Sequence, residues 1–439
     1  MVPPLLRKLI WLTVATSFFV MFEPAPCDAL LCMALIAAAA AGRHHVLPAA
    51  GLPVYTSLFF LILANLVSLA FAEEALPSLR FFAITVYLFL AFLLFAGLIG
   101  IEGPKLADHL SNALFVAALA AVFVGLLAHF RLIPNAEIFF RDEYMLRVKS
   151  TFKDPNVFSP FVVTAFMLAF SRVVDGGRGA RMAAFLMVPY AVGILLAFSR
   201  GAWVLLAIAL FIFLSAHVLV LRRPAAMRRL AIAGALVPLV AIPVLVYFIA
   251  ASDQSQYLQG RLGLKAYDVE DRFVNHGAAI QVGLDNPLGI GPGMYSPTRG
   301  LMAVHNLYIR VFVENGMLGL VALLAFLGTV LTRMAAGIMR RGEHAGTYAC
   351  CMATVIGTLV ESWIIDTLHW RHLFLVMGIP IGLAIYEARQ RVEAVQTVRK
   401  PEPAPSAQPS AQPVVRSPAA GGRDAPELST ASTTADRRE

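Results

Sequence analysis

Residues 185–216 read FLMVPYAVGILLAFSRGAWVLLAIALFIFLSA, two apolar runs that meet at one charged residue, Arg200. Each run is close to the ~20 residues that an α-helix needs to cross a hydrocarbon core of about 30 Å. Only Ser199 and Gly201 flank the arginine. The stretch therefore predicts two consecutive membrane helices joined by a tight turn. The arginine in that turn is either a snorkelling residue that contacts lipid head groups or part of a binding site.

The whole chain has the composition of a polytopic membrane protein. Of its 439 residues, 59% are hydrophobic and only 14% are charged, and the mean hydropathy is +0.74. These values exclude a soluble domain with a polar surface. We predict an all-α fold with about 12 transmembrane helices. The predicted spans are 9–22, 27–41, 52–72, 80–101, 109–131, 155–173, 181–198, 202–221, 230–250, 306–331, 345–365 and 372–388.

The distribution of Lys and Arg predicts the orientation in the membrane. These residues cluster at alternate breaks between the spans, which by the positive-inside rule places both termini in the cytoplasm. The break at Arg200 then faces outward, as does a large periplasmic loop at about 251–304, between spans 9 and 10. The N-terminal run also resembles a signal peptide, but EPAPCDA at 23–29 lacks a cleavage pattern of small residues, so a retained first span is favoured.

The chain divides into a transmembrane domain at 1–395 and a tail at 396–439. The tail is rich in Pro, Ala and Ser, which predicts a disordered cytoplasmic extension without chemistry of its own. The four cysteines have neither metal-binding nor redox spacing, and we interpret them as packing residues. The sequence also has no histidine–carboxylate cluster and no Asp-x-Asp pair, so we predict no metal site.

Arg200 is the first candidate for chemistry. It opens a helix, so the free N–H groups and the positive dipole end of that first turn point the same way as the guanidinium. The planar, permanently charged fork suits phosphate oxygens. With Ser199 beside it, Arg200 would form an anion site at the outer membrane surface, unless it only contacts lipid.

The second candidate lies in DNPLGIGPGMYSPTRGLMAVHNLYIRVFVENGMLG, residues 285–319. Glycines such as Gly291 and Gly293 predict a tight turn whose backbone approaches a ligand or another helix closely. His305 and Asn306 then open the next helix. The dipole at a helix start disfavours imidazolium, so a neutral His305 could accept a proton as a general base, or it could be an ordinary interfacial residue.

Three further segments complete the pattern. VEDRFVNHGAAIQVGL, residues 269–284, predicts a helix on the membrane surface with Arg272 on its polar or small face. Asp154 followed by Pro155 predicts a helix start. Arg310 and Glu314 are spaced to neutralise each other within one span. Loop 251–304 is nearly neutral overall, which excludes a general basic patch, and we expect no nucleic-acid partner.

Taken together, FSRGAW at 198–203, the arginine helix, NPLGIGPGMY at 286–295 and HNLYIRVFVENGMLG at 305–319 resemble the O-antigen ligases. Their superfamily also contains O-antigen polymerases and protein O-oligosaccharyltransferases. The motifs cover a core of about residues 150–330. Over the whole chain, the number and arrangement of the predicted spans are similar to those of this superfamily. The resemblance implies an inverting glycosyltransferase at the periplasmic face of the bacterial inner membrane. It would move a glycan from undecaprenyl diphosphate to a lipid A–core acceptor without nucleotide, cofactor or metal.

The resemblance also implies roles for individual residues. Arg200 and Arg272 would hold the lipid diphosphate, and His305 would activate the acceptor hydroxyl. Ser199, Asn306, Gly291 and Gly293 would support them. Where many members have a tryptophan just after the second arginine, this chain has Phe273 and His276, which leaves the register of that helix open.

Two alternatives remain at this point. A polymerase would use the same donor but transfer the glycan to a second lipid-linked glycan. A non-enzymatic transporter of lipid-linked glycans would need ionisable groups near the membrane midplane, for which Arg310, Glu314 and Glu361 are the candidates.

Overall fold

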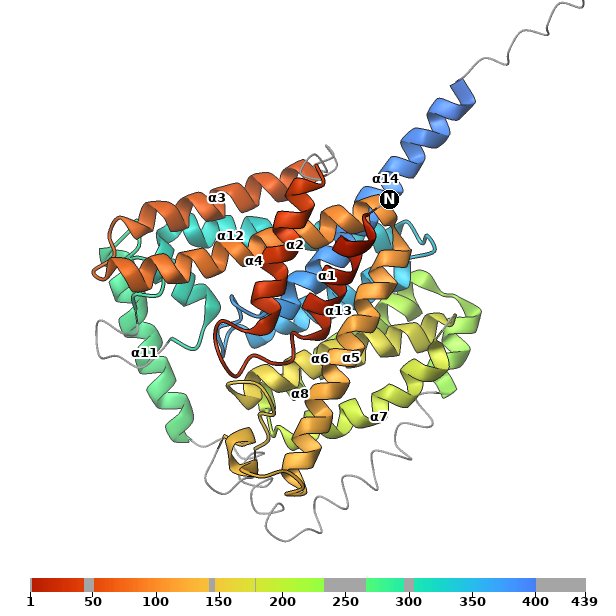
Figure 1. Ribbon diagram of the computed structural model, residues 1–439. Helices are drawn as coiled ribbons and strands as arrows, with labels where there is room; N and C mark the ends of the chain where they lie inside the picture. The colour runs from red at the N-terminus through yellow and green to blue at the C-terminus, as the bar shows by residue number, and fades with distance from the viewer. Residues whose placement is uncertain are drawn as a thin grey trace, which may run out of the picture. The chain divides into compact units, whose positions relative to one another are not determined.

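A computed structural model of the chain describes residues 2–42, 51–141, 147–177, 179–232, 266–295 and 304–399, and within these it describes side chains except at 266–274 and 397–399. The regular elements in these ranges are helices, arranged as shown in Figure 1. They are α1 (Pro4–Ala15), α2 (Pro26–Ala40), α3 (Leu52–Leu69), α4 (Ala75–Glu102), α5 (Pro104–His129), η3 (Ala136–Phe139), α6 (Pro155–Asp175), α7 (Ala180–Leu196), α8 (Arg200–Ser215), η4 (Ala216–Leu221), α11 (Ala266–Asp285), α12 (Leu307–Met339), α13 (Ala345–Glu361) and α14 (Arg371–Arg399).

Seven of the described helices are long and apolar enough to cross a membrane: α3, α4, α5, α6, α8 with η4, α12 and α14. Helices α2, α7 and α13 are apolar but shorter. The predicted all-α membrane fold is confirmed in these ranges, whereas the predicted count of about 12 spans is not. The first predicted span, 9–22, is wrong, because the helix there is α1 at Pro4–Ala15 and has only 12 residues. At 1.5 Å per residue, this helix is too short for the hydrocarbon core.

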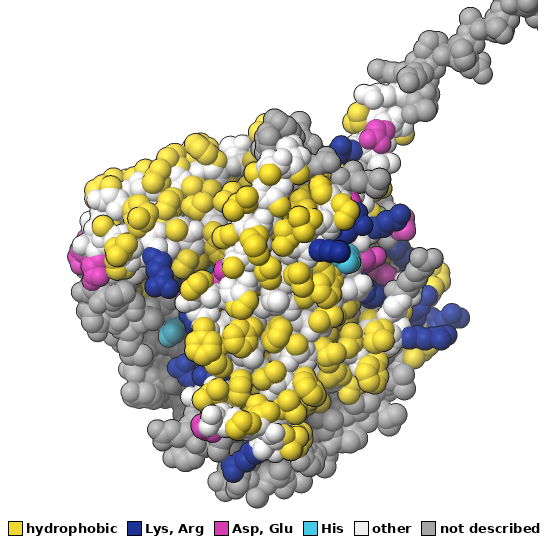
Figure 2. All heavy atoms as spheres, in the orientation of Figure 1, with side chains coloured by type: hydrophobic (Ala, Val, Ile, Leu, Met, Phe, Trp, Pro, Cys, Tyr) yellow, Lys and Arg dark blue, Asp and Glu magenta, His cyan; other side chains and the backbone are white. Residues whose placement is uncertain are grey.

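Several predicted features lie outside the described residues. Most of the span at 230–250, the loop at 251–265 and the tail from 400 onward belong to this group. On the face shown in Figure 2, hydrophobic side chains cover much of the surface of the described helices. Phe185, Phe211 and Leu76 are among its most exposed apolar side chains, at 72%, 71% and 78%. Such a surface is stable against lipid and not against water.

Specific side chains begin the helices that matter for the site. Asp154 caps α6, and its carboxylate accepts the N–H of Asn156 at 2.8 Å, with Pro155 at the first helical position. This confirms the predicted helix start. Asn306 caps α12 in the same way, because its side-chain oxygen accepts the N–H groups of Tyr308 and Ile309 at 3.0 and 3.1 Å.

Contacts between helix termini define two ends of the bundle. At the first, which we call the Arg200 end, the starts of α6 and α8 meet where Ser199 Oγ donates to Asn156 Oδ1 at 2.9 Å. The start of α12 meets the end of α13 there through the Leu307 N–H and the Ser362 carbonyl, 2.9 Å apart. At the opposite end, the Asp175 end, the end of α6 contacts η4 and the start of α13. The 21 residues of α6 separate the two ends by about 30 Å.

Helix α12 is broken near its start, and the glycine-rich loop 286–293 fills the break. Gly316 has a φ of 70° and a ψ of −175°, which interrupts the helix. The carbonyl groups of Val313 and Glu314 accept instead the N–H groups of Ile290 and Gly291, each at 3.1 Å. The turn predicted from the glycines therefore approaches another helix and satisfies its free carbonyl groups.

Replacing Gly289 by alanine should destabilise this junction strongly. Gly289 has a φ of +85°, and a Cβ there would lie 2.3 Å from the carbonyl oxygen of Glu314. The backbone strain alone costs about 1–3 kcal/mol, and the collision with backbone adds to it. Thermal unfolding in detergent should show a lower Tm than the native protein. Gly328→Ala is the matched control, because that glycine lies in α12 with nothing within 4 Å, and an unchanged Tm in Gly289→Ala would contradict the account.

Candidate functional site

Arg200 lies where the sequence places it, at the first position of α8. Helix α7 ends at Leu196, and Phe198 turns the chain with a φ of 46°. Ser199 then caps α8, since its hydroxyl accepts the Ala202 N–H at 3.4 Å. Arg200 itself is half-buried. The guanidinium and the N–H groups of the first turn thus belong to one helix start, which is a favourable place for an anion.

Arg147 is a second arginine at this turn, and it was not predicted. It is buried, with 8% exposure. Its Nη2 donates to Asn156 Oδ1 at 3.0 Å and its Nε to the Ala197 carbonyl at 3.4 Å. Asn156 Oδ1 also accepts from Ser199, so one amide oxygen connects Arg147 to the cap of α8. The positive charge near the start of α8 is therefore larger than Arg200 alone supplies.

A buried carboxyl group lies against the same helix start. Glu361 is the last residue of α13 and is 2% exposed. A Cβ at position 201 would lie 2.5 Å from its Oε1, so Gly201 is the residue that lets the two helices approach. Glu361 Oε2 makes no hydrogen bond within the described part of the chain. Glu361 therefore lies at the end of α13 and not in its middle, where the ionisable group of a transporter would be expected.

His305 immediately precedes the cap of α12 and is exposed. The segment after it is fixed to the end of α13. The Leu307 N–H donates to the Ser362 carbonyl, the Tyr308 hydroxyl donates to the Leu359 carbonyl at 2.7 Å, and the Tyr308 ring packs on Trp363. The structure therefore brings His305 and Arg200 to the same end of the bundle, both beside the C-terminus of α13.

The glycines predicted as supporting residues hold the loop to α12. The Gly293 N–H donates to Glu314 Oε2 at 2.8 Å, and Gly291, with a φ of +102°, donates to the Glu314 carbonyl. The predicted pair of Arg310 and Glu314 is present at 3.1 Å. Arg310 also forms an ion pair with Asp366 in the loop between α13 and α14. Arg310 thus connects α12 directly to the loop that holds Asp366, and Glu314 connects it to loop 286–293.

That loop, residues 362–370, contains two groups with shifted pKa values. Although burial opposes ionisation of Asp366, the Arg310 guanidinium holds the pKa of this carboxyl below its usual value. Burial lowers the pKa of His369 to about 4. The His369 ring lies 2.9 Å from Thr85 Oγ1 and 4.3 Å, between centroids, from the Phe81 ring. His369 is therefore neutral in the folded protein near pH 7.

Stability should fall as the pH falls from about 6.5 to about 4. In that window the unfolded chain binds a proton at His369 that the folded chain does not, so protonation favours unfolding. We expect the Tm in detergent to drop by a few degrees between pH 7.5 and pH 5. His369→Gln should show a smaller drop over the same range. An equal drop in the variant would show that other groups cause it.

Arg272 lies in α11, as predicted, but its side chain is outside the described part of the structure. The described half of α11 packs on α12. Ala279 is fully buried there, and Gly283 lies against the Phe312 ring, where a Cβ would come within 2.4 Å. Ile280 and Leu284 are exposed on another face. The face of α11 that carries the small residues Ala279 and Gly283 is therefore the face that packs on α12.

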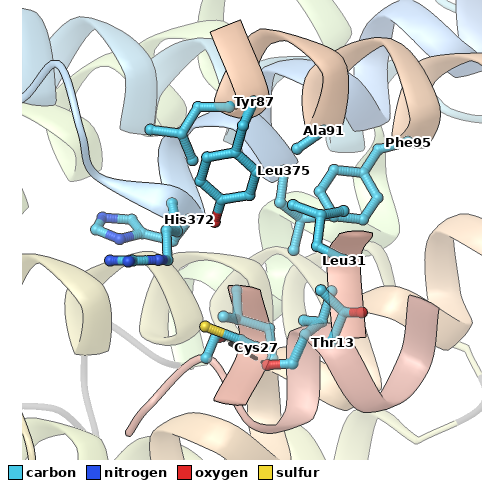
Figure 3. A pocket seen from close by; sticks show the side chains of 13 residues that line it. Thr13, Cys27, Leu31, Tyr87, Ala91, Phe95, His372 and Leu375 are labelled. Atoms are coloured by element: carbon cyan, nitrogen blue, oxygen red, sulfur yellow. Dashed lines mark hydrogen bonds between the residues drawn. The ribbon is translucent and has the colours of Figure 1, made fainter. Parts of the chain in front are cut away.

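A separate cavity of about 30 Å³, shown in Figure 3, lies among α1, α2, α4, α5 and α14. Its lining includes Cys27, Tyr87 and His372. Arg371 forms an ion pair with Asp28 at 2.8 Å, and the Tyr87 hydroxyl donates to the same carboxylate. These contacts join three helices, and the cavity is mostly apolar and small. We interpret it as packing and assign it no role in the site.

A comparison with protein families matches the part of the chain that contains these residues. The family model described as O-antigen ligase matches residues 182–324. The match runs from α7 into α12 and includes Arg200, Arg272, loop 286–293 and His305. A search of curated proteins finds no match to the chain. Residues 182–324 are therefore similar to the O-antigen ligase family, in agreement with the resemblance of the motifs.

Proposed function

We propose that this protein is an O-antigen ligase type of glycosyltransferase, which moves a glycan from undecaprenyl diphosphate to a lipid A–core acceptor. The observation that supports the proposal is the placement of two complementary groups at one end of the bundle. Arg200 opens α8 and His305 precedes α12, and both lie beside the end of α13. The first suits a diphosphate and the second suits the hydroxyl that attacks the sugar.

The reaction follows from these roles. The acceptor oxygen attacks the anomeric carbon while the bond from that carbon to the diphosphate oxygen breaks, which inverts the configuration. Arg200, Arg272 and the N–H groups at the start of α8 stabilise the charge that grows on the leaving diphosphate. Arg147 adds positive charge beside them. The proton of the acceptor hydroxyl passes to His305 as the new bond forms.

The orientation in the membrane follows from the charges at the two ends. Basic residues are dense at the Asp175 end, including Lys105, Arg172, Arg223 and Arg341. We assign that end to the cytoplasm, with both termini, and the Arg200 end to the periplasm. Both substrates are then held by their own lipids at the outer face of the inner membrane, so confinement in two dimensions favours their encounter.

Transfer by the purified protein tests the proposal. The reaction contains undecaprenyl-diphosphate-linked glycan and lipid A–core in detergent, with a chelator and without nucleotide. We expect a glycan–lipid A–core product on a gel. A requirement for ATP or a divalent metal would refute the mechanism. Product formed only on a second lipid-linked glycan would identify a polymerase, and movement of the donor across vesicles without any product would identify a transporter.

A further inference from the structure

A pocket of about 470 Å³ opens at the Asp175 end of the bundle. Its walls come from the start of α5, the end of α6, the start of α13 and the middle of α14. The length of α6 separates it from Arg200 by about 30 Å. Its size lies within the ~300–1,000 Å³ of small-ligand sites. The transfer reaction does not use it.

The pocket has an apolar floor and a charged rim. The floor includes Leu168, Ile379 and Leu383, which are 7%, 0% and 1% exposed. Leu168 lies seven residues before Asp175 on α6, which is about 10 Å deeper in the bundle. An apolar floor below a charged rim fits an amphiphile, in which a charged head group is joined to an apolar part, as in the acyl-glycerol portion of a phospholipid.

The rim carries both signs of charge. Lys105, Arg172 and Arg223 supply the cations, and Asp108, Asp175 and Glu343 supply the carboxylates. The α5 and α13 helices also begin at the rim, so their first N–H groups and positive dipole ends add to the anion-binding part. A purely anionic ligand would meet three carboxylates here. A zwitterion with a phosphate and an amine would satisfy both sets.

Neighbouring side chains hold the charged groups of the rim in place. Arg172 donates to Asn112 and, at 3.3 Å, to Asp108, and it lies over the Phe115 ring at 4.9 Å. Asp175 accepts from the Ser171 hydroxyl at 3.2 Å, and its other oxygen lies 3.4 Å from His217 Nε2. These contacts fix Arg172 and Asp175 before any ligand arrives.

The approach of two helices to Asp175 depends on local backbone features. A Cβ at position 346 would lie 2.0 Å from Asp175 Oδ2, so Gly346 is needed for α13 to begin there. His217 is the second residue of η4, a π-helical turn at the end of α8. Such turns are rare and occur often at functional sites.

We propose that this pocket binds the phosphoethanolamine head group of a phospholipid. The phosphate lies against Lys105, Arg172 and Arg223, and the ammonium group lies against Asp175. The acyl-glycerol portion rests on the apolar floor. The site is distinct from the diphosphate site at the Arg200 end.

Lipid retention measured by native mass spectrometry tests this site. The purified full-length protein is incubated in detergent with phosphatidylethanolamine or phosphatidylglycerol of identical acyl chains. We expect one phosphatidylethanolamine retained about tenfold better than phosphatidylglycerol. Arg172→Gln and Asp175→Asn should each reduce that retention about tenfold, since each removes a charge-assisted contact. Arg181→Gln is the control, because Arg181 is exposed at the start of α7 and does not line the pocket.

One additional variant and one competition experiment distinguish the possible outcomes. Lys105→Gln alters an exposed rim residue without a packing role, so it reports on binding if Asp175→Asn fails to fold. Displacement of the lipid by soluble O-phosphoethanolamine would support the head-group chemistry and show that the free compound can also occupy the pocket. Retention of the lipid in its presence would show that the pocket takes the head group from a lipid. Equal retention of both lipids by the native protein would overturn the zwitterion assignment, whereas a gain of phosphatidylglycerol binding in Asp175→Asn would support it. Unchanged retention in all three pocket variants would overturn the site.

Discussion

Replacing His305 by alanine should reduce glycan transfer by about 10²–10⁴-fold, which is the usual contribution of a general base. Donor binding should remain, because the diphosphate contacts belong to the arginines. Raising the pH should not rescue the variant, since a sugar hydroxyl stays protonated far above any pH that the protein tolerates. The measurements are the initial rate of product formation on lipid A–core and the retention of lipid-linked glycan by the purified variant.

His129→Ala is the matched control for this experiment. His129 ends α5 at the Arg200 end, where it packs on the Phe130 ring and has no role in the mechanism. Its variant should transfer at close to the native rate. A His305→Ala variant that keeps more than half of the native rate would remove His305 from the mechanism. A variant that loses donor binding as well would assign His305 to the diphosphate site instead.

Replacing Arg200 by lysine should reduce glycan transfer by about 10²-fold while the protein remains folded. This loss is expected if one planar charge-assisted contact to the leaving diphosphate is removed. The ammonium group of lysine keeps the charge but cannot make two parallel hydrogen bonds to phosphate oxygens. Arg272→Lys should behave similarly if its side chain reaches the same diphosphate. The rate of transfer and the Tm of each variant are measured together.

Arg80→Lys serves as the control for the arginine variants. Arg80 is exposed near the start of α4, at the same end of the bundle, and the mechanism does not use it. It should keep the native rate. If Arg200→Lys and Arg272→Lys both transfer at the native rate with normal protein levels, the diphosphate assignment is wrong.

Local signals explain which parts of the fold could be predicted. The start of α6 follows from Asp154 and Pro155, and the start of α12 follows from Asn306, because a cap acts within one turn of its own helix. The break in α12 was not predicted. The sequence from Leu307 onward is apolar enough for one continuous span, and Gly316 alone does not specify a break without the loop that satisfies the freed carbonyl groups.

The difference between local signals and distant contacts also explains which residues of the candidate site could be predicted. Arg200 was identified because the charge interrupts two apolar runs, a pattern visible in the sequence. Arg147 and Glu361 were assigned no role in the site because their importance depends on distant contacts. Arg147 reaches the Ala197 carbonyl, 50 residues away, and Glu361 lies against Gly201. Nothing in the residues around either one indicates these neighbours.

The junction between loop 286–293 and the broken helix α12 has a consequence for sequence divergence. Surface loops usually tolerate insertions and deletions among relatives. Here, the N–H groups of Ile290 and Gly291 must meet two carbonyl groups of α12 in register, and Met317 must meet the Pro287 carbonyl. One added or removed residue would leave these groups without partners. Evolution should therefore conserve the length of this loop as strictly as that of a helix, and length changes should accumulate in other loops.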